Sequence, residues 1–143
     1  QGKPFPITHM DMTRFWLSLK EAAAFVVHVI PHMCGGEVFV PKLSGCAVVD
    51  IAKAISGELH PEIEIIGIRP GEKIHETLLS IDEARHSVEQ LGYYVIYPEF
   101  HSWTARIHWK EVNLSRLPHD FAYRSDTCPK LYPVDIQELL GIR

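Results

Sequence analysis

At 143 residues the chain is long enough for one domain, since folding at this length buries roughly two-thirds of the surface that the unfolded chain exposes. A formal net charge of −4, a pI near 6.1 and the lack of a Lys/Arg cluster argue against a nucleic-acid-binding surface, because phosphate backbones select basic patches. The three cysteines form no Cys-x-x-Cys pair and no apolar run reaches membrane-spanning length, so we expect a protein of the reducing cytoplasm without a disulfide framework or a membrane partner.

The first half of the chain predicts two helices and a strand. Residues 1–16 are rich in proline, threonine and aromatics and are expected to be extended. Ser18 and Glu21 form a capping box before an alanine- and valine-rich helix that Pro31 should end. "GGEVFVPK", residues 35–42, predicts a strand after a glycine turn. Residues 44–57 predict a second helix, with one apolar face made of Val48, Ile51, Ala52 and Ile55.

The second half continues the alternation. Residues 62–68, "EIEIIGI", predict a strand that is at least half buried. Ser80 and Glu83 repeat the capping box, and a third helix is expected from there to Gly92. "YYVIYP", residues 93–98, predicts a strand, and residues 100–125 are expected to be irregular or to form short edge strands. A last helix should begin near Pro133. This alternation favours an α/β class.

Cofactor and metal sites are not supported by the residue patterns. No Gly-x-Gly-x-x-Gly turn, Walker loop or Tyr-x-x-x-Lys pair is present, so a redox enzyme cannot be assembled from this chain alone. His28, His32 and Cys34 have the spacing of metal ligands on a helix, but Pro31 would disturb that face. Surface histidines at a helix end are the simpler interpretation, and we expect no metal.

The stretch "IRPGEK" carries the main candidate site. A strand would deliver Arg69 to its end, Pro70 and Gly71 would force a turn, and Glu72 follows. A guanidinium can donate two parallel hydrogen bonds to phosphate oxygens, and a carboxylate can accept hydrogen bonds from ribose hydroxyls, so the pair could bind a nucleoside diphosphate. The alternative is an Arg–Glu ion pair that ties the turn to the surface, and spacing alone favours this second interpretation.

Arg14 raises the same question from another place in the chain. It lies among methionine, phenylalanine and tryptophan in "DMTRFW" and is expected to be partly desolvated. Its partner would be either a phosphate or Asp11, and the spacing does not choose between them.

Several stretches together resemble one enzyme family. "ITHMDMTRFWLSLKEAAAFVV", "GGEVFVPKL", "DIAKAI", "IGIRPGEKIHETLLSIDEAR", "YYVIYPEF" and "FAYRSDT" resemble, in order and spacing, the C-terminal portion of UDP-N-acetylglucosamine 4,6-dehydratases. These are extended short-chain dehydrogenases/reductases of the polysaccharide-biosynthesis type, and the 5-inverting branch is the most similar. Met10 and Cys128 depart from the residues usual in the family.

The resemblance implies a substrate-binding role for three residues. Arg69 and Glu72 would contact the diphosphate and ribose of a UDP-sugar, and Arg14 would contact a phosphate. Family members use NADP or NAD to oxidise C4 of the hexose, eliminate water across C5 and C6, and return the hydride to C6. The residues for that chemistry would lie upstream, so we expect no catalytic or cofactor-binding residue in this chain.

The expected architecture follows from the same resemblance. Residues 1–143 would form a single C-terminal substrate-binding lobe of α/β class, without the main body of the NAD(P)-binding Rossmann sheet. Its expected partners are a UDP-sugar, the N-terminal Rossmann domain of the complete enzyme and, as is common in the family, further copies of the enzyme. The alternatives are a non-catalytic nucleotide-sugar-binding or interaction module, and a structural fragment whose apolar surface once packed on the missing domain.

Overall fold

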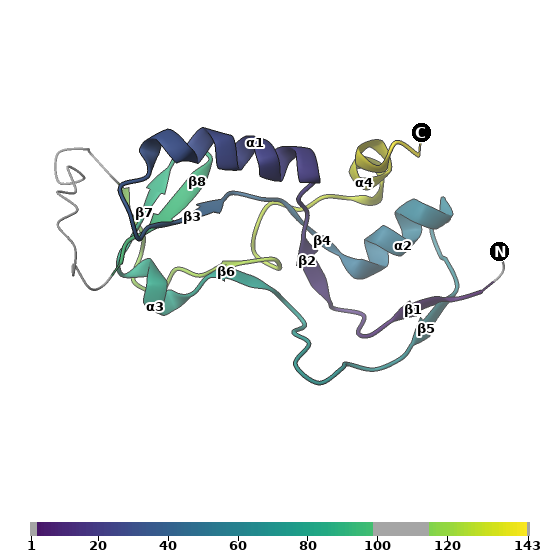
Figure 1. Ribbon diagram of the computed structural model, residues 1–143. Coiled ribbons are helices and arrows are strands. Elements are labelled where there is room, and N and C mark those ends of the chain that lie inside the picture. The colour runs from purple at the N-terminus through teal and green to yellow at the C-terminus, as the bar shows by residue number, and fades with distance from the viewer. Residues whose placement is uncertain (1–2, 99–114, 143) are drawn as a thin grey trace. The chain divides into compact units, whose positions relative to one another are not determined.

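The computed structural model describes residues 3–98 and 115–142, which divide into two compact units (Figure 1). Unit 1 contains the chain up to Trp16, Leu43–Glu76 and the chain from Arg124 onward, and unit 2 contains Leu17–Lys42 and Thr77–Tyr123. The single-domain assignment stays a prediction. Within the described ranges, no helix has the length and apolar character that crossing a bilayer requires.

Unit 1 is built from two strand pairs and two helices. β1 (Phe5–Ile7) pairs in parallel with β5 (Ile63–Ile65), and β2 (Thr13–Phe15) pairs antiparallel with β4 (Gly45–Ala47). The helices are α2 (Val48–Ser56), which begins directly after β4, and α4 (Pro133–Leu140).

The core of unit 1 lies between its helices and β4. Cys46, Ala54 and Ile136 are buried there, and Trp16, Ile51 and Leu131 pack against them. The Nε2 atom of Gln137 on α4 donates to the carbonyl oxygen of Ala54 on α2 at 3.1 Å, so a polar contact accompanies the apolar ones.

Unit 2 consists of one long helix, an antiparallel sheet and short elements. The helices are α1 (Leu19–Val29), the 3₁₀ turn η1 (Ile30–His32) and α3 (Ile81–Ala84). The sheet has the order β3-β8-β7-β9, made of β3 (Val38–Pro41), β7 (Ser87–Gln90), β8 (Tyr93–Ile96) and β9 (Ser115–Arg116). β6 (Thr77–Leu79) pairs with β10 (Tyr123–Arg124). Val88, Tyr93 and Val95 form the core of the sheet, and Phe25 of α1 packs against it.

Many elements expected from the sequence are present, in a mixed α/β chain. The capping box of Ser18 and Glu21 opens α1, which gives way to a 3₁₀ turn at Pro31. The predicted strands appear as β3 and β8, and the last helix starts at Pro133. β9 and β10 are short strands, as expected, while residues 99–114 of that region lie outside the described residues.

The strand expected over residues 62–68 is wrong in length and burial. β5 covers only Ile63–Ile65, and Ile65, Ile66 and Ile68 are 44–52% exposed. Gly67, with a φ of +83°, breaks the extended conformation before Arg69, because that region is open to glycine but strained for other residues. Arg69 therefore follows an irregular segment rather than the end of a strand.

Two helices are shorter than expected. The third stops after Ile81–Ala84, and Ser87–Gln90 leave it to pair with β8 across the two-residue loop Leu91–Gly92. Gly92, with a φ of +92°, belongs to a hairpin rather than to a helix end. The second helix begins only at Val48, because the preceding residues form β4, and Ile55, expected on its apolar face, is 51% exposed.

Gly45 is the point of closest backbone approach in unit 1. Its N–H donates to the carbonyl oxygen of Pro129 at 2.8 Å and its carbonyl oxygen accepts from Leu131 N–H at 2.8 Å. A Cβ atom at this position would lie 2.6 Å from the carbonyl oxygen of Ser125 and 2.7 Å from Cys128 Sγ. The segment from Ser125 to Leu131 can therefore lie along β4 only because residue 45 has no side chain.

We predict that Gly45→Ala lowers the free energy of unfolding by about 1–3 kcal/mol, as overpacking of a tight site does. Amide hydrogen exchange should show that Leu131 N–H loses protection, since its acceptor is the carbonyl of residue 45. Gly57→Ala is the control, because Gly57 has a φ of +73° but nothing within 4 Å of an added Cβ. It should destabilise through backbone strain and leave Leu131 protected. Equal protection of Leu131 in both variants would contradict the steric argument.

Candidate functional site

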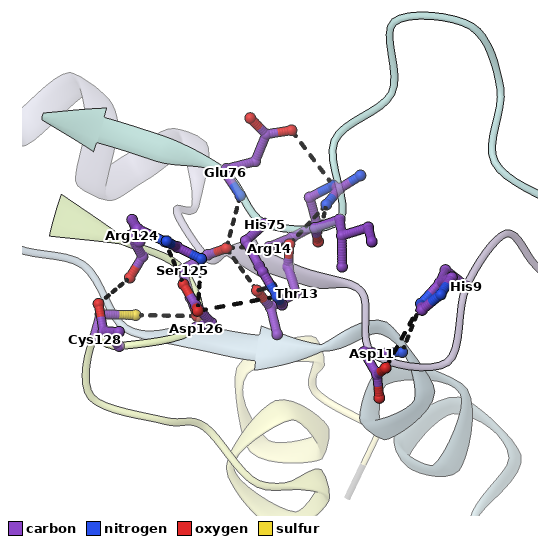
Figure 2. A network of polar contacts seen from close by, with 12 residues as sticks. His9, Asp11, Thr13, Arg14, His75, Glu76, Arg124, Ser125, Asp126 and Cys128 are labelled. Atoms are coloured by element: carbon purple, nitrogen blue, oxygen red, sulfur yellow. Dashed lines mark hydrogen bonds and ion pairs between the residues drawn. The ribbon is translucent and has the colours of Figure 1, made fainter. Parts of the chain in front are cut away.

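Three segments of unit 1 that are distant in sequence meet in one polar network (Figure 2). They are β2 with Thr13 and Arg14, the loop from Arg69 to Glu76, and the tail from Arg124 to Cys128. Backbone bonds tie the first to the second, since Thr13 N–H donates to the carbonyl oxygen of Ile74 at 3.0 Å. Ser125 N–H donates to the carbonyl oxygen of Glu76 at 2.9 Å and ties the third to the second.

The loop begins with a reverse turn over Arg69–Glu72. Glu72 N–H donates to the carbonyl oxygen of Arg69 at 3.0 Å, and Pro70 with Gly71, whose φ is +80°, match the preferences of a type II turn. The Glu72 carboxylate accepts from Arg69 N–H at 3.1 Å and so closes the turn from the other side. The turn is fixed by its own residues, and the Arg69 side chain is exposed.

Arg14 lies over this loop with its guanidinium facing two carboxylates. Nη1 donates to the carbonyl oxygens of Thr13 at 2.7 Å and Ile74 at 3.1 Å, which fixes the orientation of the group. Nη2 is 3.8 Å from Glu72 Oε1 and Nε is 3.7 Å from Glu76 Oε1. Of the two expected partners, Asp11 is wrong, because it lies near His9 and apart from Arg14 (Figure 2). A phosphate partner stays a prediction.

Ser125 is the centre of the network and is 1% exposed. Its Oγ accepts from Glu76 N–H at 2.9 Å, lies 2.7 Å from Thr13 Oγ1 and donates to the carbonyl oxygen of Thr13 at 3.2 Å. The hydroxyl and the N–H of Ser125 thus bond the N–H and the carbonyl oxygen of Glu76, and the hydroxyl also bonds Thr13, the first residue of β2. Ser125 therefore joins all three segments.

His75 connects the network to a second charged pair. Its Nδ1 lies 2.9 Å from Thr13 Oγ1 and its Nε2 lies 4.0 Å from Asp126 Oδ2. Arg124 donates to both oxygens of Asp126, from Nε at 3.0 Å and from Nη2 at 2.9 Å. Burial would raise the pKa of Asp126, but the hydrogen bonds from Arg124 and the charges of Arg124 and His75 outweigh burial and lower the pKa below its ordinary value.

The structure brings two of the three predicted site residues into direct proximity. Arg14 and Glu72 are ion-paired, whereas Arg69 meets Glu72 through its backbone and not through its side chain. Within residues 3–98 and 115–142, the Arg69 guanidinium makes no hydrogen bond or ion pair. The surface ion pair that spacing alone favoured is therefore wrong.

Sequence reasoning missed Glu76 and Ser125 as members of the site. Glu76 ends the "KIHE" stretch, and its four-residue spacing to Glu72 gives no signal that both carboxylates face Arg14, because the segment is neither helix nor strand. Ser125 gives no local signal, because its partner Thr13 is 112 residues away in the chain.

Cys46 and Cys128 are structural, and His28, His32 and Cys34 form no metal-binding group in the described part of the chain. Burial raises the pKa of Cys46 to about 11 and also raises the pKa of Cys128, so both thiols are protonated and structural. The rings of His28 and His32 lie 5.5 Å apart near the end of α1. Across the part of the chain that the structure describes, no group of three His, Cys, Asp or Glu could hold a metal ion.

We predict that Asp126 stabilises the protein above about pH 4 and that this contribution is lost as the pH falls through its lowered folded-state pKa. The sign follows because a carboxyl group with a lower pKa in the folded state binds fewer protons there than in the unfolded state. Asp126→Asn should therefore lower the melting temperature at neutral pH and flatten its decline in acid. Asp120→Asn, at an exposed position, is the control. If the melting temperature of Asp126→Asn falls in acid as steeply as that of the unchanged protein, Asp126 is not the group responsible.

Comparison with known proteins gives this network a family context. A protein 43% identical over 97 residues is "UDP-N-acetylglucosamine 4,6-dehydratase (inverting)" of Campylobacter jejuni subsp. jejuni serotype O:2, and the match covers 68% of this chain and 28% of that protein. A "UDP-glucose 4-epimerase" of Rickettsia massiliae is 36% identical over 98 residues, covering 67% of this chain and 29% of that protein. The chain thus spans less than a third of the length of these relatives.

A solved structure supports the fold. The X-ray structure of Pen from Bacillus thuringiensis matches with a TM-score of 0.76 at 23% identity, and it covers 99% of this chain and 41% of that one. The family model described as "Polysaccharide biosynthesis protein" matches residues 1–98, which include β2 and the loop from Arg69 to Glu76. Because this match covers more than half of its length, the chain belongs to the polysaccharide biosynthesis protein family.

Proposed function

We propose that this chain is the UDP-sugar-binding C-terminal portion of an inverting UDP-N-acetylglucosamine 4,6-dehydratase and is inactive alone. The complete enzyme would act in nucleotide-sugar and polysaccharide biosynthesis. The 43% identity to the Campylobacter dehydratase supports this reaction type, and the 28% share of that protein supports a partial chain. The observation that carries the binding role is the exposed Arg69 guanidinium, which has no partner among the described residues although its backbone is fixed by a turn.

Arg69 suits the diphosphate of the ligand. A permanently charged guanidinium binds two phosphate oxygens at once, and because no described residue is bonded to the Arg69 side chain, its N–H donors are available as far as residues 3–98 and 115–142 are concerned. Because the Glu72 carboxylate and the Pro70–Gly71 turn fix the Arg69 backbone, only the side chain has to be ordered on binding.

Glu72 suits the ribose, and Arg14 suits a phosphate. One oxygen of Glu72 accepts from Arg69 N–H and the other faces Arg14, yet a carboxylate has further lone pairs that can accept two hydroxyl groups. The two Arg14 contacts with glutamates are longer than hydrogen bonds, so Nε and Nη2 keep donors for a phosphate while Nη1 holds the group in place.

The nicotinamide cofactor, NADP or NAD, would supply hydride transfer in the complete enzyme. Its binding residues do not fit this chain, because the sequence has no glycine-rich turn between a strand and a helix. We therefore assign the cofactor and the catalytic residues to the N-terminal Rossmann domain, which would be the principal partner. A cytoplasmic location and assembly into homo-oligomers belong to the same proposal.

Substitution of Arg69 in the full-length protein that carries this chain tests the binding role. Arg69→Ala should weaken binding of UDP by about tenfold to a hundredfold, since a charge-assisted hydrogen bond contributes about 1.5–3 kcal/mol. Isothermal titration with UDP gives the dissociation constant. Arg85→Ala is the matched control, because Arg85 is an exposed arginine directly after α3 whose partner, Asp82, belongs to unit 2. It should bind UDP like the unchanged protein.

If Arg69→Ala binds UDP with the affinity of the unchanged protein, the assignment of the diphosphate contact to Arg69 is wrong. A separate titration of the 143-residue chain decides whether the site is autonomous. Binding of UDP to the full-length protein without dehydration of the sugar would favour the alternative, a non-catalytic nucleotide-sugar-binding module.

A further inference from the structure

The loop that carries the proposed UDP-sugar contacts has little regular structure of its own. Between β5 and β6 the chain forms neither helix nor strand, although it includes Arg69, Glu72 and Glu76. A binding loop of this kind needs external bonds that hold its backbone, because each residue left free to move costs conformational entropy when a ligand orders it. The source of those bonds therefore bears directly on the affinity of the site.

Three residues from outside the loop bond its backbone at the C-terminal end. Thr13 N–H and Arg14 Nη1 donate to the carbonyl oxygen of Ile74. Ser125 bonds both the N–H and the carbonyl oxygen of Glu76. Ser125 as a residue is 1% exposed, so bulk water has little access to replace a bond that is lost there. Ser125 lies outside residues 1–98, the part of the chain that the family model matches.

The hydroxyl groups of Thr13 and Ser125 can stay bonded to each other and to His75 in either tautomer of the imidazole. When His75 Nδ1 accepts, Thr13 Oγ1 donates to it, and Ser125 Oγ donates to Thr13 Oγ1 in place of the carbonyl oxygen of Thr13. When Nδ1 carries a proton, Thr13 accepts from His75 and donates to Ser125, which donates to the carbonyl oxygen of Thr13. In both arrangements Ser125 Oγ retains a lone pair for Glu76 N–H.

Charged groups surround this chain of hydroxyls on two sides. Asp126 faces His75 Nε2 from the tail and is itself held by Arg124. The Arg14 guanidinium, from β2, lies 3.7 Å from the Glu76 carboxylate. Movement of the Glu76 backbone would therefore shift a carboxylate that faces Arg14 and, through Arg14, the contact with Glu72.

We propose that Ser125, supported by Thr13 and His75, is a positioning residue that orders the loop from Arg69 to Glu76 for the nucleotide part of the ligand. This role rests on the proposed function of the loop. Ser125 does not touch the ligand and acts through the Glu76 peptide groups and the Arg14 contacts. The tail of the chain thus completes a site whose ligand contacts come from earlier segments.

Ser125→Ala in the full-length protein tests the positioning role. We expect amide hydrogen exchange to show lost protection at Glu76, and UDP titration to show binding weakened by about tenfold, the effect of leaving one partly buried N–H without its acceptor. Ser87→Ala is the matched control, because Ser87 is also a buried serine, 3% exposed, and its hydroxyl donates to the carbonyl oxygen of Glu83 within unit 2. It should lose stability without any change in UDP affinity or in Glu76 protection.

Two substitutions of His75 distinguish the contribution of its contact with Thr13 from that of its contact with Asp126. An asparagine amide reaches the place of Nδ1 and can keep the bond to Thr13, whereas a glutamine amide reaches the place of Nε2. His75→Asn should therefore keep UDP affinity close to that of the unchanged protein, and His75→Gln should weaken it as Ser125→Ala does. Rescue by asparagine alone is an outcome that general loss of stability would not produce.

Each result decides one of the two proposals. If Arg69→Ala weakens UDP binding while Ser125→Ala binds like the unchanged protein, the positioning role is overturned and the proposed function stands. If the unchanged protein binds no UDP, the proposed function fails together with the role in positioning for a nucleotide, and exchange at Glu76 then decides only whether Ser125 orders the backbone of the loop. Protection lost in Ser125→Ala and kept in Ser87→Ala supports it, and protection kept in both overturns it.

Discussion

The close approach of the tail to β4 at Gly45 is the constraint on which the site depends. No side chain fits between residue 45 and the backbone of Ser125. Two hydrogen bonds of Gly45, with Pro129 and Leu131, hold the segment from Ser125 to Leu131 against β4. Ser125 is thereby brought to the end of β2 and to Glu76. A packing requirement at one glycine therefore determines the position of Ser125, the centre of the adjoining polar network.

Backbone hydrogen bonds rather than ion pairs give the network its geometry. The contacts of Arg14 with Glu72 and Glu76 are 3.8 Å and 3.7 Å long and partly exposed, and such pairs contribute little to stability. The shorter bonds from Nη1 to two carbonyl oxygens orient the guanidinium instead. This division leaves charge available for a ligand, because the groups that hold the arginine are neutral and the charged groups near it are only loosely engaged.

Features that depend on a few neighbouring residues were predictable from the sequence. The capping box at Ser18, the end of α1 before Pro31 and the turn at Pro70–Gly71 each follow from local stereochemistry, and the structure contains all three. The helix expected from Ser80 to Gly92 does begin with the predicted capping box, but it ends at Ala84. Ser87–Gln90 pair with Tyr93–Ile96, and a tertiary partner outweighed the local helix signal.

The same limit applies to the candidate site: short motifs predicted some of its residues, and contacts between distant segments determine the others. The motif around Arg69 and Glu72 identified the residue types that could bind a nucleotide, and the resemblance to dehydratases indicated their ligand. Neither could show that Arg69 is fixed through its backbone while Arg14 takes the carboxylates, because that depends on how β2 lies against the loop. Ser125 is the extreme case, since a buried serine 112 residues from Thr13 has no local pattern that marks it. The residues that would touch a ligand are thus visible in short motifs, whereas those that hold them in place become visible only when the chain is folded.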